Sequence, residues 1–94
     1  MTFSPTWQLL RTLVEDLIEL RGELVELVVA EKTERIEAYA ASNEKTDAGR
    51  KRDADFASLT YWRDRVKLET KIQQKEDLHQ LLTLAVTHGV EIIE

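Results

Sequence analysis

The stretch Asn43-Glu44-Lys45-Thr46-Asp47-Ala48-Gly49-Arg50 decides how this chain folds. It is the only interior cluster of turn-forming and helix-capping residues, and runs of helical character extend on both sides of it. Thr46 or Asp47 is the expected N-cap of the second run. The pattern therefore predicts a long antiparallel helical hairpin, a two-helix coiled coil, with its turn at about residues 43–47.

The composition also favours an all-α protein. Of the 94 residues, 33% are charged, while only three are Gly and one is Pro. Such a composition is typical of long helices rather than of sheets with many turns, and the length fits a single domain, residues 1–94. The chain has no Cys, which excludes disulfides and thiolate chemistry. The first residues do not resemble a signal peptide and no apolar run is long enough for a membrane span, so we expect a soluble, cytoplasmic protein.

The first expected helix covers about residues 5–42. Ser4 can cap it, and Pro5 suits its first position because proline lacks only an N–H that would be unpaired there. Its heptad seam consists of Leu10, Leu13, Leu17, Leu20, Leu24 and Leu27. A second apolar row beside this seam consists of Val14, Ile18, Val25, Val28 and Val29. One neighbouring helix cannot cover both rows, so we expect a homo-oligomer whose interface includes Leu17, Leu24, Val25 and Val28.

The second expected helix covers about residues 47–88 and is followed by a short apolar tail, residues 89–94. It carries an apolar row of Phe56, Leu59, Trp62 and Val66. The register of Trp62 with Leu59 and Val66 favours burial of the indole. Gly89 suits the left-handed position that follows a helix, and we expect the tail to pack on another apolar surface.

Positive charge gathers in the middle of the chain. Residues 45–75 hold nine Lys or Arg against five acids, although the whole chain has a net charge of -5. This distribution is typical of a single-stranded nucleic-acid surface, on which cations follow phosphates and aromatic rings stack on bases. The candidate binding residues are Arg50, Lys51, Arg52, Arg63, Lys67, Lys71 and Lys75, and the last four recur every four residues as one ridge. In the alternative interpretation, the ridge faces the acidic first helix or is simply solvated.

The sequence lacks a recognisable catalytic or metal-binding constellation. Paired carboxylates such as Glu15 and Glu19 share a helix face, but they have no nearby metal-binding His. His79 and His88 are nine residues apart, and no Gly-rich phosphate loop is present. We therefore expect no enzymatic activity, no cofactor, no metal and no small-molecule substrate.

Several segments resemble phage recombination mediator proteins of the UvsY type. The run from Val66 to Glu76, followed by Leu81-Leu82 and by His88-Gly89-Val90-Glu91-Ile92, is similar to the C-terminal helix of that family, although the family usually has Arg where this chain has His88. The run from Leu10 through Glu34-Arg35-Ile36-Glu37 to Tyr39 looks like its first long helix. The turn region from Tyr39 to Arg50 looks more like small helical-hairpin proteins of actinobacterial phages.

The resemblance implies a homo-oligomer that binds single-stranded DNA and helps to load a recombinase in place of single-strand-binding protein, in the host cytoplasm if a phage encodes it. The competing hypothesis is a structural or protein-interaction coiled-coil module without nucleic-acid binding.

Overall fold

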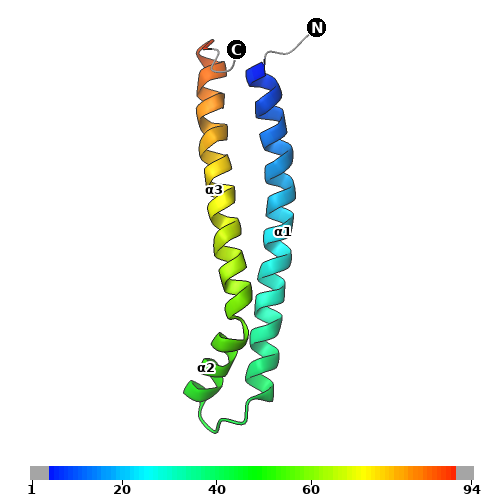
Figure 1. The fold of residues 1–94 in the computed structure, drawn as a ribbon, viewed down its shortest axis with the longest axis vertical. Coiled ribbons are helices and arrows are strands. Elements are labelled where there is room, and N and C mark those ends of the chain that lie inside the picture. The colour runs from blue at the N-terminus through cyan, green and yellow to red at the C-terminus, as the bar shows by residue number, and fades with distance from the viewer. Residues whose placement is uncertain (1–4, 91–94) are drawn as a thin grey trace. The chain divides into compact units, whose positions relative to one another are not determined.

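The computed structural model describes residues 5–90, which form three helices: α1 (Pro5–Ala41), α2 (Asp47–Ala57) and α3 (Leu59–Thr87) (Figure 1). No strand occurs in this part of the chain, so the all-α class is confirmed. The chain divides into two compact units, one formed by Met1–Gly22 with Glu69–Glu94 and the other by Glu23–Leu68. The expected cap Ser4 and residues 91–94 of the expected tail lie outside the described residues.

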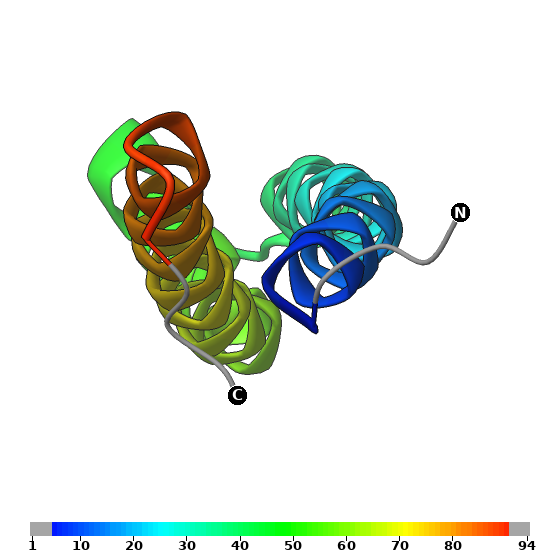
Figure 2. The ribbon, with the colours of Figure 1, turned by 90° about the horizontal axis from the view of Figure 1, so that it is seen from above.

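The first unit is held together by an apolar seam. The beginning of α1 and the end of α3 run side by side in opposite directions (Figures 1 and 2). The residues buried between them are Leu13, Leu17 and Leu20 of α1 and Ile72, Leu82 and Ala85 of α3, each at most 7% exposed. Two ion pairs also join the helices: Arg21 donates to Glu76 at 2.6 Å, and Lys75 to Asp16 at 3.4 Å. These pairs are partly exposed to solvent and add little stability, so the leucine seam contributes most to holding this unit together.

One glycine just beyond α3 allows the helix to end where it does. Gly89 has a φ of 68°, a left-handed conformation that costs glycine nothing. The N–H of Val90 bonds the carbonyl of Ala85 at 2.7 Å, and the N–H of Gly89 bonds that of Val86 at 3.1 Å. This pair of bonds is a Schellman motif, which satisfies carbonyls that the helix itself leaves unpaired.

In the second unit, α2 begins at a capped and crowded turn. Thr46 is its N-cap: the extended backbone of this residue brings its Oγ1 to 3.1 Å from the N–H of Gly49. A Cβ on Gly49 would lie 2.9 Å from the Cβ of Glu44, closer than side chains normally approach. The turn therefore requires a residue without a side chain at position 49, where a capping box would place Glu.

The expected single helix over about residues 47–88 is divided at Ser58, where the chain changes direction (Figure 1). Ser58 keeps near-helical angles, and its N–H still bonds the carbonyl of Ala54 at 3.1 Å. Its buried Oγ donates back to the carbonyl of Asp55 at 3.3 Å, an arrangement that bends helices. Arg35 of α1 donates to the same Oγ at 3.3 Å and pairs with the Asp55 carboxylate at 2.6 Å. A residue of another helix thus binds two residues at the break, a contact that local sequence pattern does not reveal.

Candidate interaction surfaces

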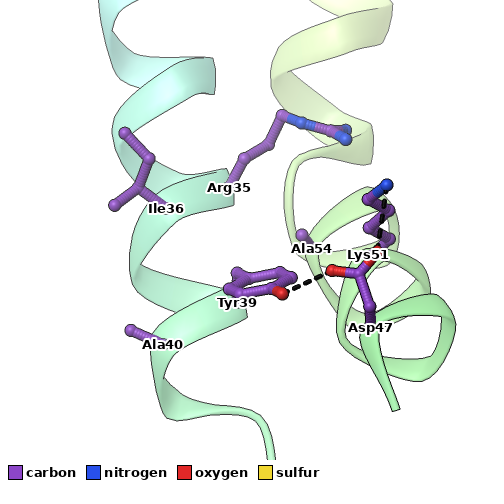
Figure 3. A pocket seen from close by; sticks show the side chains of 7 residues that line it. All are labelled: Arg35, Ile36, Tyr39, Ala40, Asp47, Lys51 and Ala54. Carbon is purple, nitrogen blue, oxygen red and sulfur yellow. Dashed lines mark hydrogen bonds and ion pairs between the residues drawn. The ribbon is translucent and has the colours of Figure 1, made fainter.

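The first candidate surface consists of apolar side chains of α1 that face solvent. In the first unit, Ile18 is 67% exposed, and Trp7 and Val14 are about half exposed. In the second unit the exposed residues are Val25 at 63%, Val29 at 58% and Ile36 at 70%. Figure 3 draws Ile36 on the side of α1 turned away from Asp47. We call Val25, Val29 and Ile36 the outer row of the second unit.

The four residues expected at an oligomer interface differ in their exposure. Val25 is exposed and available to a partner, whereas Leu24 and Val28 are half-buried within the chain. Leu17 is only 5% exposed because it packs in the seam of the first unit. Leu17 is therefore the least exposed of the four residues.

A second apolar row lies on α3 in the second unit. The expectation that Trp62 is buried was wrong: the indole is 47% exposed, and Leu59 and Val66 are also partly exposed. Phe56 on α2 is 81% exposed, the highest value among the large apolar residues of the described chain. Glu31 and Arg35 of α1 lie beside Leu59 and Trp62 at one hollow, where they bind Arg65 and Asp55.

The basic ridge divides into paired and unpaired residues. Lys75 binds Asp16 across the first unit, which fits the interpretation that this part of the ridge faces acidic α1. Lys71 in the same unit is exposed, as are Arg63 and Lys67 in the second unit, and within residues 5–90 none of these three forms an ion pair. The nearby Arg65 is instead held at 2.6 Å by the half-buried carboxylate of Glu31.

The three remaining basic candidates lie on α2. The Nε of Arg50 donates to the carbonyl of Glu44 at 3.1 Å, and its guanidinium lies 5.7 Å from the centre of the Tyr39 ring. Lys51 pairs with Asp47 at 3.1 Å one turn away. Arg52 is exposed and has no ion pair in the described chain. Arg50 and Lys51 thus support the turn, and only Arg52 is fully available to a ligand.

An open hollow of about 420 Å³ lies beside this turn (Figure 3). Tyr39 reaches from α1 and donates a hydrogen bond to the carboxylate of Asp47 at the start of α2. This bond raises the pKa of Tyr39 above its ordinary value and, together with Lys51, lowers the pKa of Asp47. Both changes favour the neutral phenol and the ionised carboxylate, so the pair works as a polar latch between α1 and α2.

A second hollow, of about 330 Å³, lies by the helix break and is lined in part by Arg35, Ser58 and Trp62. The polar groups at its wall already satisfy one another through the bonds of Arg35 to Ser58 and Asp55. Neither hollow brings together a nucleophile, a base and an orienting group. Within residues 5–90, no group of three or more His, Asp or Glu side chains is placed to hold a metal ion. No helix in that range is long and apolar enough to cross a bilayer.

Searches against protein-family models, curated proteins and solved structures found no match. The resemblance to recombination mediators therefore remains a prediction from the sequence.

The sequence analysis identified part of the exposed apolar surface of α1 but missed the regular spacing of its residues. Two sets of α1 residues each recur every eleven positions: Trp7, Ile18 and Val29, and Val14, Val25 and Ile36. Eleven residues are close to three turns of a helix, so such a repeat keeps its members on one face. The eleven-residue spacing can be read from the sequence, but the analysis followed the heptad seam of leucines beside it instead.

Proposed function

We propose that this chain is a homo-oligomeric helical interaction module that associates with further copies of itself through the exposed apolar residues of α1. The observation that carries the proposal is the outer row, because Val25, Val29 and Ile36 are each more than half exposed in the middle of a well-formed helix. A single exposed Val or Ile is common, but three on one face, which the eleven-residue spacing continues along the helix, form a patch of the kind that marks an interface. In this proposal the helices form the long antiparallel hairpin expected from the sequence.

The free energy that burial of the outer row can contribute is comparable to the cost of association. Fully burying one Val or Ile side chain contributes roughly 1.5–3 kcal/mol, so each residue of the outer row would contribute about 1–2 kcal/mol in an oligomer. Association itself costs roughly 4–15 kcal/mol. The outer row alone is therefore marginal in a dimer, and the exposed residues of α1 in the first unit add a comparable amount.

One substitution in the outer row tests this proposal. Val25→Glu places a charge where an apolar partner is expected, and we predict that it dissociates the oligomer in sedimentation velocity while far-ultraviolet circular dichroism keeps its helical signal. Thr60→Glu is the matched control, since it adds the same charge at an exposed position of α3 outside both apolar rows. Loss of association in both variants, or in neither, would count against the outer row.

A second candidate function, binding of single-stranded DNA, is supported by the exposed groups of α2 and α3 in the second unit. Arg52, Arg63 and Lys67 have no ion pair within residues 5–90, and Phe56 offers an exposed ring for stacking. The resemblance to recombination mediators points in the same direction and adds a recombinase as the partner. Glu26 and Glu37 of α1 are exposed in the same unit and oppose the approach of a phosphate backbone, so this function ranks second.

A salt titration with oligo-dT tests DNA binding. If Arg63 and Lys67 contact phosphates, changing both to Gln weakens binding and reduces the slope of log affinity against log salt by about 1.4, roughly 0.7 for each contact. Lys45→Gln is the control, because Lys45 is an exposed cation in the turn. An unchanged slope in the double variant would leave self-association as the remaining function.

A further inference from the structure

Polar bonds attach α2 to α1 in the second unit. Each of the three Asp carboxylates of α2 binds a residue of α1 or of the turn directly after it. The pairs are Asp47 with Tyr39, Asp53 with Ser42, and Asp55 with Arg35. The residues that α2 buries are the small Gly49 and Ala54, while Phe56, its one large apolar side chain, is 81% exposed. Little apolar burial therefore holds α2 in its place.

The break between α2 and α3 keeps most of the geometry of a helix. Ser58 has a φ of -90° and a ψ of 0°, close to ordinary helical values. Its N–H bonds the carbonyl of Ala54 at 3.1 Å, and its carbonyl accepts a bond from the N–H of Trp62 at 3.0 Å. Both bonds have the four-residue spacing of an α-helix. No Gly or Pro occurs between Arg50 and Thr87, so a rotation at Ser58 can join the two helices.

Joining the helices would align four exposed side chains. They follow one another at steps of four, seven and four residues: Arg52, Phe56, Arg63 and Lys67. A helix turns by roughly 100° per residue, so on one continuous helix these positions fall within about 60° of arc. No Asp or Glu between residues 47 and 68 falls within that arc. We call these four residues the joined face, and the break at Ser58 separates its first two members from its last two.

We propose that α2 is a movable arm that releases its bonds to α1 and joins α3 as one helix, and that this straight state presents the joined face to single-stranded DNA. The movement of α2 is independent of the functions proposed above, whereas the role of DNA rests on the second candidate function. Cations follow phosphates and rings stack on bases, so a strand contacts all four residues in line only in the straight state. A ligand that binds one state better shifts the population toward that state.

The bent and straight states exchange interactions of similar size. The bent state keeps the polar bonds of α2 to α1, which lie at an exposed surface and are individually weak. The straight state places Leu59 three positions after Phe56 on one helix, where apolar side chains stabilise each other. Its helix from Asp47 to Thr87 would be only slightly longer than the 37-residue α1, so the turn can still connect the two.

Two spin labels measure the movement, because the natural chain has no Cys that would react with them. Labels on Ala48→Cys and Asp64→Cys are sixteen positions apart, roughly 24 Å along a straight helix and less when α2 is bent. Both positions are exposed and lie outside the joined face. Excess oligo-dT should move the distance from the shorter value of the free chain toward about 24 Å.

A triple variant removes the partners of the α2 carboxylates and leaves every residue of α2 and α3 unchanged. It combines Arg35→Met, Tyr39→Phe and Ser42→Ala. We expect the label distance to reach about 24 Å without DNA, while far-ultraviolet circular dichroism keeps its helical signal. Arg21→Met is the matched control, since it removes one cation and one ion pair that does not involve α2, and its distance should stay short.

Titration of the same chains with oligo-dT measures the consequence for binding. The triple variant should bind roughly threefold to tenfold more tightly than the natural chain, because more of its molecules are straight. The gain cannot come from added charge, since the variant has lost the cation of Arg35.

A disulfide between positions 42 and 53 provides the opposite change. The side chains of Ser42 and Asp53 touch, so Ser42→Cys with Asp53→Cys can be oxidised to a bond that holds α2 bent. The oxidised form should bind oligo-dT at least about threefold more weakly than the reduced form of the same molecule.

Each outcome has a distinct meaning. A longer distance and tighter binding in the triple variant, with weaker binding in the oxidised form, support the proposal. A distance that neither oligo-dT nor the triple variant changes, or a triple variant that loses helical signal, overturns the movable arm. A longer distance with equal binding by the oxidised and reduced forms overturns the role of the joined face. If no chain binds oligo-dT at low salt, the second candidate function fails, and the label distance in the triple variant alone decides whether α2 moves.

Discussion

The two units of this chain use the same helices but different means of cohesion. In the first unit, Leu13, Leu17 and Leu20 of α1 are buried against apolar residues of α3. In the second unit, Glu31, Arg35 and Tyr39 of α1 bind charged or hydroxyl partners instead, and the buried residues are the small Gly49, Ala54 and Ser58. Apolar side chains that the second unit does not bury remain on its surface. The unit that is joined by polar pairs thus keeps more of its large apolar side chains exposed.

The largest expected difference between the units comes from truncating a leucine. Leu17→Ala removes a fully packed side chain from the first unit and should lower the free energy of unfolding by about 2–5 kcal/mol. Leu27→Ala in the second unit removes a half-buried side chain and should cost about 1–2 kcal/mol. Urea denaturation followed by circular dichroism measures both. Equal losses would show that the second unit has an apolar core after all.

A smaller effect is expected at the helix break. Arg35→Met keeps the aliphatic stem but removes the bonds to Asp55 and to the buried Oγ of Ser58, so we expect a loss of about 1 kcal/mol. Arg21→Met removes an exposed pair from the first unit and should cost less than about 0.5 kcal/mol. Spin labels on α2 and α3 on either side of Ser58 should also report a changed distance in Arg35→Met only. An unaltered distance would show that Arg35 does not hold the bend.

Replacing either of two glycines, one in each unit, with Ala should change the stability of the protein in opposite directions. A Cβ at Gly22 would meet no atom within 4 Å, so Gly22→Ala should stabilise the helix by about 0.5–1 kcal/mol. A Cβ at Gly49 would lie against the Cβ of Glu44, so Gly49→Ala should destabilise the protein by about 1 kcal/mol. Thermal unfolding measures both. Stabilisation by both substitutions would mean that the turn adapts to a side chain.

The smallest effect is the pH dependence of the polar latch. Because the pKa of Asp47 is lowered by Tyr39 and Lys51, its contribution is present above the ordinary Asp pKa of about 4 and disappears as the pH falls through the lowered value. The raised pKa of Tyr39 acts at the other end: its contribution is present below about pH 10 and disappears as the pH rises through the raised value. The stability difference between the natural chain and Tyr39→Phe should therefore be largest between these limits. A pH-independent difference would exclude the latch.

The sequence predicted features that depend on nearby residues. The helical class, the cap at Thr46 and the glycine stop at Gly89 depend on side chains within a few positions of the backbone groups that they serve. The break at Ser58 could not be predicted, since Arg35, which lies 23 positions earlier, supplies the bond that marks it. The exposure of Trp62 could not be predicted either, because an apolar period identifies a face of a helix but not the residues opposite it. Which residues of the basic ridge form ion pairs could not be predicted for the same reason. Only the structure separates Lys75, which pairs with Asp16, from Lys67, which has no ion pair within residues 5–90.

The mass of the natural chain in solution tests the central claim most directly. Sedimentation equilibrium over a range of micromolar concentrations should give a mass of at least two chains, with dissociation on dilution, because the outer row becomes buried only in an assembly. A mass of one chain at every concentration would contradict the account and would mean that Val25, Val29 and Ile36 face water in the working protein.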